Sequence, residues 1–213
     1  MISLINLEEV AEEIGKIALT LNDNLQLKES LKITCREAVR MCGEAISAIH
    51  RRALNIAESK LKLADEKIKQ IMKNIKERPE LISGSVIVAM QEYVEAKSLY
   101  EIVTRKRIPL NSELKVLEQA YVLGLADLIG ELRRKAIDLL KAEEIEESER
   151  MVELMERLHE ILQPLEYPRS LVPELRSKID VMRRLIEDTR KIVAEAQLSI
   201  RLRKELEKIA DKL

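Results

Sequence analysis

The chain has 213 residues, of which 46% are hydrophobic and 35% charged, with only five glycines, five prolines and no Phe or Trp. This composition is typical of long helices with little sheet. The formal net charge of −1 gives no global sign of nucleic-acid binding. We expect one all-α domain over residues 1–213, a bundle of about six to seven helices.

Several sequence features indicate a soluble cytoplasmic protein. The most weakly polar run, residues 81–90, is far shorter than the roughly 20 residues of a membrane helix, so we expect no membrane contact. Acidic residues follow the start too closely for a signal peptide. Cys35 and Cys42 are seven residues apart on an expected helix, about 10 Å of rise, too far for a mutual disulfide.

The N-terminal half predicts three helices. Asn6, with Glu9 three residues later, forms a capping signal for a short helix that ends near residues 22–24. A long helix is expected over residues 25–77, because no helix breaker precedes Pro79, although a bend near Asn55 remains possible. A third helix is expected over residues 80–105, before Pro109.

The C-terminal half predicts three further helices. Asn111 or Ser112 caps a helix that runs to about residue 142. The acidic stretch 143–149 is either a loop or the first turn of a helix lasting to Leu162. The last helix, residues 173–208, carries a 3-4 apolar repeat, which fits packing within the bundle or an interface between subunits.

Four acids mark the candidate site. Glu92 and Glu95 are three residues apart, and Asp127 and Glu131 are four apart, so each pair shares one face of its helix. In a chain this charged, acids at helical spacing commonly form a solvated face. These pairs, however, interrupt apolar stripes, and small residues such as Gly124 would let the two helices approach closely.

Carboxylates gathered away from water repel one another unless they are protonated or neutralised by a cation. Oxygen ligands without Cys or His suit Mg²⁺ or Mn²⁺. We find no phosphate-binding glycine loop, nucleophile elbow or zinc spacing. His50 is interpreted as a surface histidine, with phosphate contact as the alternative.

Two motifs give the chain a resemblance to the translin family, and to its translin-associated factor X branch more than to translin. They are residues 91–96, QEYVEA, and residues 121–134, YVLGLADLIGELRR, with weaker similarity over residues 36–51. The resemblance implies a helical subunit that assembles into an octameric hollow shell around RNA or single-stranded DNA. Factor X subunits are Mg²⁺-dependent endoribonucleases that cut single-stranded RNA, including nicked duplex strands.

Carried over by this resemblance, the catalytic and metal-binding acids are Glu92, Glu95 and Asp127, with Glu131 as a fourth catalytic residue. The basic, His-containing cluster that often precedes the first motif is replaced by residues 83–88, SGSVIV. RNA contact then depends on other cations. The candidates to follow the nucleic-acid backbone are Arg36, Arg40, Arg51, Arg133 and Arg134.

Two other functions use the same residues. A nucleoside-triphosphate pyrophosphatase of the all-α type also holds Mg²⁺ with a Glu-x-x-Glu helix and acids on the next helix. A translin-like binder or scaffold would instead keep the acids for structure alone. Release of pyrophosphate from free nucleotides would identify the first alternative, and single-strand binding without metal-dependent turnover would identify the second.

Overall fold

The computed structural model describes residues 6–210, with backbone alone for 204, 205 and 207–210, and the expected all-α class is confirmed. The described part contains no strand. Its elements are α1 (Leu7–His50), α2 (Leu54–Glu77), a 3₁₀ turn η1 (Pro79–Leu81), α3 (Gly84–Arg105), α4 (Asn111–Leu114), α5 (Glu118–Lys141), α6 (Ile145–Leu162) and α7 (Leu175–Ala210). None of the helices in this part is apolar over a stretch long enough to span a bilayer.

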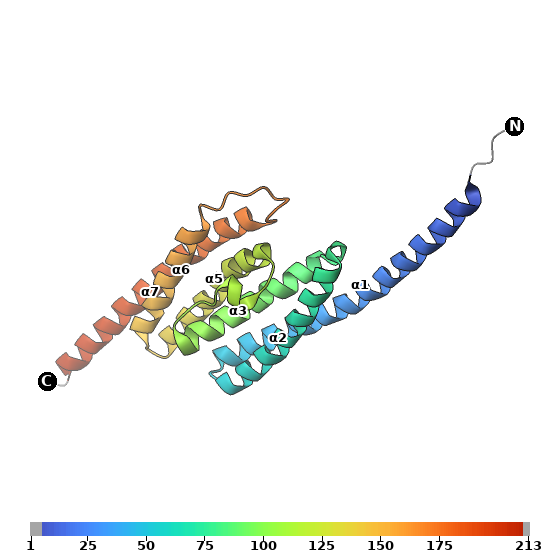
Figure 1. The fold of residues 1–213 in the computed structure, drawn as a ribbon. Helices are drawn as coiled ribbons and strands as arrows, with labels where there is room; N and C mark the ends of the chain where they lie inside the picture. Colours follow the sequence, from blue (N-terminus) through green and yellow to red (C-terminus); the bar gives the residue numbers. More distant parts are fainter. Residues whose placement is uncertain (1–5, 211–213) are drawn as a thin grey trace.

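Helices α3 and α5 form the centre of the bundle (Figure 1). Helices α1 and α2 pack on α3, and α6 and α7 pack on α5 and on each other. Gly124 of α5 sits against α3, where an added Cβ would lie 2.6 Å from the Gln91 carbonyl oxygen and 2.7 Å from Val94 Cβ. The expected close approach of the two acidic helices is therefore present, and it depends on this glycine.

The first helix begins after Asn6 as predicted, but the break that follows it lies at a different place in the chain. No break occurs near residues 22–24, and α1 continues for 44 residues. The predicted 25–77 helix is instead divided at residues 51–53, where Arg52 adopts a left-handed φ of 59° and Ala53 N–H donates to the Ala48 carbonyl. The left-handed backbone conformation costs a non-glycine residue about 1–2 kcal/mol. Nothing in the local sequence around Arg52 predicts this conformation.

The helix predicted from residue 111 is also interrupted. Four residues form α4, and Lys115 then takes a left-handed φ of 55° before α5 begins at Glu118. The acidic stretch 143–149 is divided between a turn and α6, which begins at Ile145. Other boundaries agree with the prediction to within a few residues.

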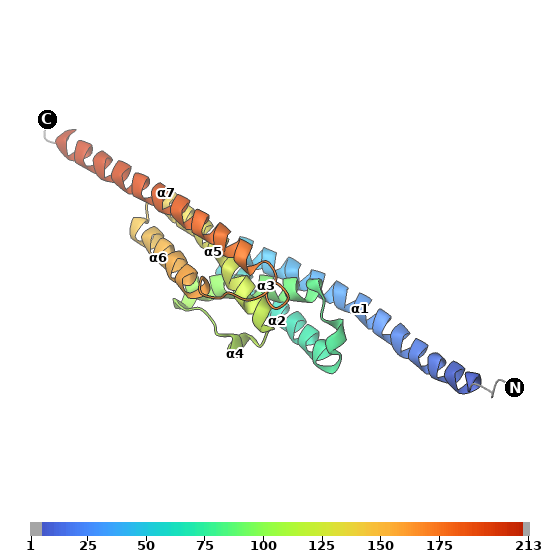
Figure 2. The ribbon, with the colours of Figure 1, turned by 90° about the horizontal axis from the view of Figure 1, so that it is seen from above.

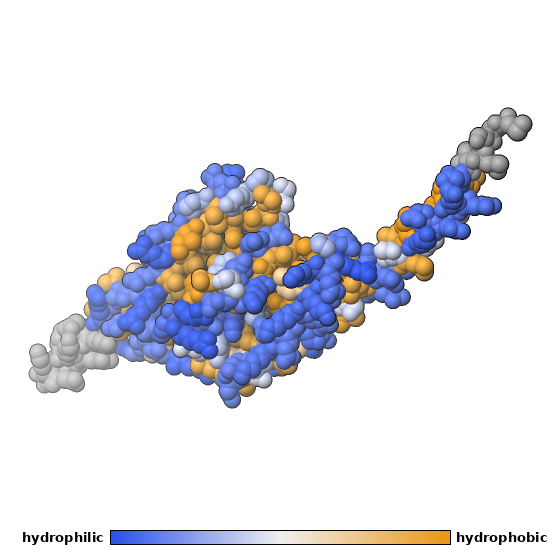
Figure 3. Space-filling model, in the orientation of Figure 1, coloured by the Kyte–Doolittle hydropathy of each residue, from blue (hydrophilic) through white to orange (hydrophobic). Residues whose placement is uncertain are grey.

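The apolar repeat of α7 packs within the chain along its first half, with Leu175, Met182, Ile186 and Val193 buried. The N-terminal part of α1 has no such cover. It extends beyond the bundle in two perpendicular views, at the end opposite the C-terminus (Figures 1 and 2). Large hydrophobic side chains are exposed along this arm, between hydrophilic ones (Figure 3).

Candidate active site

The four predicted acids lie on α3 and α5 and face a shared, partly buried space. Each of Glu92, Glu95, Asp127 and Glu131 is neither fully buried nor fully exposed. Burial raises the pKa of Glu95 to about 8, with further contributions from the negative charges of the other three, while Lys178 opposes them. The pKa of Glu92 is raised in the same way, by burial first and then by Asp127 and Glu131. The site therefore concentrates negative charge.

Two groups that the sequence analysis did not assign hold Asp127. The Gln91 side-chain amide donates to one carboxylate oxygen, and Lys178 Nζ from α7 lies 2.5 Å from the other. Lys178 directly precedes the partly buried seam residue Ile179, and a lysine beside an apolar seam is the sequence signal that could have identified it. Its ammonium supplies one positive charge to the acidic site.

The side chain of His50 is buried, contrary to the prediction of a surface histidine, with 3% of it exposed. Its Nε2 lies 2.5 Å from Glu131 Oε2. Its Nδ1 lies 3.3 Å from Asp138 Oδ2, within ion-pair distance but without hydrogen-bond geometry. Stepping along α1 from Ile46 by four residues would have placed His50 at the edge of the buried stripe.

The chemistry of these side chains suits a hard divalent cation, because the donors are carboxylate oxygens. In the described residues, however, no three His, Cys, Asp or Glu side chains already form a metal site. Asp127 is engaged by Lys178 and Gln91 instead. A divalent cation at these acids would have to displace Lys178 from Asp127.

The comparisons with known proteins agree on one family. A sequence model of the Translin family matches residues 3–201. The chain belongs to the translin family. Over 184 residues it is 36% identical to an uncharacterised protein of Methanocaldococcus jannaschii, covering 85% of this chain and 81% of that protein.

Solved structures support the same membership of the translin family. The crystal structure of AfC3PO is 31% identical, with a TM-score of 0.75 over 92% of this chain and 98% of that one. AfC3PO in complex with duplex RNA gives 30% identity and a TM-score of 0.74, with the same coverage. Apo-NeC3PO, at 24% identity, shares the fold with a TM-score of 0.75 over 91% of this chain and 98% of that chain.

The five predicted arginines do not form one cluster in this translin-family chain. Arg134 is exposed and its guanidinium lies 3.8 Å from Glu131, beside the acids. Arg36 and Arg40 are exposed on α1. Viewed down the axis of that helix, both side chains project within about 80° of the side chain of His50. The remaining two are Arg51, exposed after the end of α1, and Arg133, about 160° from Glu131 around α5. Arg133 is therefore directed away from the acids.

Proposed function

We propose that this translin-family protein is a Mg²⁺-dependent endoribonuclease of the factor X type that also binds single-stranded nucleic acid. The observation that carries the proposal is the gathering of four carboxylates between α3 and α5, where burial and mutual repulsion raise the pKa of Glu95 to about 8. Such a cluster disfavours its own ionised form and is stabilised by a bound cation.

RNA as the substrate class is supported by the relatives. A similar structure, 30% identical over 92% of this chain, is AfC3PO in complex with duplex RNA. The exposed Arg134 beside Glu131 provides a cation for a phosphate backbone near the acids, and Arg36 and Arg40 are exposed cations further along α1. We propose single-stranded RNA as the cleaved substrate, with single-stranded DNA as a bound one.

The metal would be held by Glu92, Glu95 and Asp127. Bound Mg²⁺ would neutralise charge on the scissile phosphate and lower the pKa of a coordinated water. Glu131 accepts a hydrogen bond from His50, which fixes the direction of the carboxylate. We assign Glu131 to take the proton of the attacking water, because its second oxygen is free of His50.

The test is incubation of the purified chain with end-labelled single-stranded RNA, with and without Mg²⁺. Internal cleavage that requires Mg²⁺ supports the endoribonuclease. If pyrophosphate is released from free nucleoside triphosphates and RNA stays intact, the pyrophosphatase alternative is correct. Tight RNA binding without turnover would identify a non-catalytic binder, the role that the Lys178–Asp127 ion pair favours.

Replacing Lys178 with Met should tighten Mn²⁺ binding by about tenfold, or roughly 1.4 kcal/mol. The ammonium competes with the metal for Asp127 and repels it across the site, and both effects vanish in the variant. Calorimetric titration of the metal-free protein with Mn²⁺ measures the change. Arg176→Met, an exposed cation in the same turn of α7, should leave the affinity unchanged. Weaker binding to Lys178→Met would mean that this lysine supports Asp127 rather than competing for it.

We further propose that the chain assembles into a hollow homo-oligomer, an octamer by its family likeness, through the projecting arm of α1. Exposed apolar residues recur there with 3-4 spacing, at Leu7, Val10, Ile14, Ile17 and Leu21. This is the seam of a two-stranded coiled coil, and in the described residues nothing covers it. A second copy of the same helix supplies the complementary surface.

Combining Ile14→Glu with Ile17→Glu should reduce the oligomer to smaller species, because it places charge in the seam. Light scattering after gel filtration measures the molar mass. The matched control is Glu12→Gln with Glu13→Gln, which changes polar positions of the same turn. An unchanged mass for the seam variant would exclude the arm as the assembly surface.

A further inference from the structure

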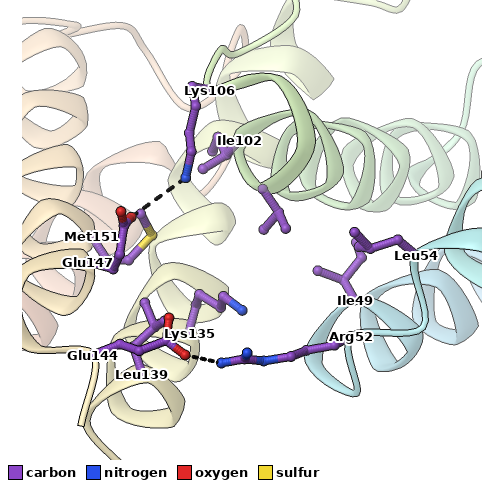
Figure 4. A pocket seen from close by; sticks show the side chains of 11 residues that line it. Ile49, Arg52, Leu54, Ile102, Lys106, Lys135, Leu139, Glu144, Glu147 and Met151 are labelled. Atoms are coloured by element: carbon purple, nitrogen blue, oxygen red, sulfur yellow. Dashed lines mark hydrogen bonds and ion pairs between the residues drawn. The ribbon is translucent and has the colours of Figure 1, made fainter. Parts of the chain in front are cut away.

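A second cavity lies beyond the acidic site, where the α1–α2 junction faces α3, α5 and α6 (Figure 4). Its volume is about 360 Å³, within the range of about 300–1,000 Å³ of small-molecule sites. Six aliphatic or thioether side chains line its apolar walls: Ile49, Leu54, Ile102, Val103, Leu139 and Met151. These walls can hold the flat, weakly hydrated face of an organic group.

Charged side chains occupy the rim of the cavity. Arg52 pairs with Glu144, and Lys106 Nζ lies 3.6 Å from Glu147 Oε2. Both ion pairs bridge the cavity, one from α1–α2 to α6 and one from α3 to α6 (Figure 4). Each cation on the rim is thus matched by an acid, and the two pairs leave the fifth charged residue, Lys135, without a partner of its own.

Lys135 reaches from α5 into the space between these ion pairs (Figure 4). It is partly buried, and in the part of the chain that the structure describes it has no hydrogen bond or ion pair. Burial lowers the pKa of Lys135, as does Arg52, whereas Glu144 and Asp138 act in the opposite direction. A partly buried ammonium without a partner is unfavourable, and an anion in the cavity would satisfy it.

The cavity is adjacent to the acids. Lys135 follows Glu131 by one turn of α5, a rise of about 6 Å. On the opposite wall, Ile49 directly precedes His50, which contacts Glu131. A ligand in this cavity and a phosphodiester at the acids would therefore be neighbours along α5.

We propose that this cavity binds one nucleotide, with its phosphate on Lys135 and its base against the aliphatic walls. The combination of one unpaired cation, a rim whose other two cations are each paired with an acid, and an apolar interior matches a phosphate joined to a flat base. The source of the nucleotide is a free mononucleotide or the 5′-phosphorylated end of a strand. The second source rests on the proposed RNA substrate, whereas the binding site itself does not.

The test is calorimetric titration of the metal-free full-length protein with adenosine 5′-monophosphate, adenosine and inorganic phosphate. The mononucleotide should bind more tightly than either part alone. Lys135→Met should weaken its binding by about tenfold or more, the loss of one charge-assisted hydrogen bond. Lys141→Met, an exposed lysine on the same helix, should bind the mononucleotide as the unmodified protein does.

Folding of the variant is checked by its thermal midpoint, which should be equal or higher in Lys135→Met because the unpaired buried charge is gone. A mononucleotide that does not bind, or binds Lys135→Met equally well, would overturn the proposal.

Displacement of bound mononucleotide by a 5′-phosphorylated oligonucleotide, but not by its 5′-hydroxyl form, would identify a strand end as the natural occupant. Lack of displacement would identify the free nucleotide. Because no metal is present, these results are independent of whether the protein cleaves RNA.

Discussion

Glu95→Gln should lower RNA cleavage by more than about 100-fold while RNA retention stays intact. The pKa of Glu95 is raised to about 8, because the carboxyl group is largely buried and lies beside the other three acids. A neutral amide keeps its size but loses the charge that would bind a divalent ion. Single-turnover cleavage of labelled RNA with Mg²⁺, together with filter binding of the same RNA, measures both effects.

The control is Glu153→Gln, which removes an exposed carboxylate from α6 and should cleave normally. Cleavage by Glu95→Gln at the normal rate would remove this residue from the active site. Loss of RNA binding together with cleavage would instead indicate that Glu95 supports the fold or the RNA surface.

The same substitution should change how stability depends on pH in the absence of metal. The folded-state pKa of Glu95, about 8, is above its ordinary value of 4.5, so the folded protein binds this proton more tightly than the unfolded chain. Its contribution to stability is therefore present below about pH 4.5 and is lost as the pH rises through about 8. At pH 9 the thermal midpoint of Glu95→Gln should exceed that of the unmodified protein by at least about 2–4 °C.

Gly124→Ala should destabilise the protein by about 1–3 kcal/mol and also impair cleavage. The new Cβ would lie 2.6 Å from the Gln91 carbonyl oxygen, a backbone atom that cannot yield without moving α3 away from α5. Such a shift separates Glu92 and Glu95 from the acids of α5. Thermal unfolding should show a midpoint lower by about 3–10 °C, and Mn²⁺ affinity should fall in parallel.

Gly130→Ala provides a matched control on the same helix, because a Cβ at Gly130 would meet no atom within 4 Å. Alanine is favoured over glycine inside a helix by about 1 kcal/mol, so this variant should be slightly more stable. Equal stabilisation by both alanines would show that α3 and α5 are not in tight contact at Gly124.

The helical class and the pairing of the acidic helices could be predicted from the sequence, since both depend on local periodicity. The helical repeat alone puts Glu92 and Glu95 on one face of a helix, and Gly124 on the same face as Asp127. Both acidic pairs are on the sides of α3 and α5 that face each other. Periodicity is informative here because these two helices are central and continuous.

What could not be predicted depends on contacts between distant segments or on backbone strain. Lys178 is 51 residues from Asp127, and nothing in its local sequence specifies which helix α7 packs against. The break at Arg52 comes from a left-handed residue that is neither Gly nor Asn, the residues that normally announce such a turn. His50 is predicted at the surface because histidine side chains are often exposed, whereas the burial of this side chain depends on Glu131 and Asp138 of α5.

Because α1 is uninterrupted, any change in its length also rotates its N-terminal arm relative to the bundle. One helix of 44 residues, roughly 66 Å long, carries the proposed assembly seam at one end and the histidine that contacts Glu131 at the other. Adding or deleting a single residue between them would rotate the seam by about 100° relative to the bundle and misdirect every neighbouring copy. An insertion of seven residues would restore the direction to within about 20° and lengthen the arm by about 10 Å. Changes of near-whole turns would thus alter the diameter of an assembled shell while preserving its symmetry.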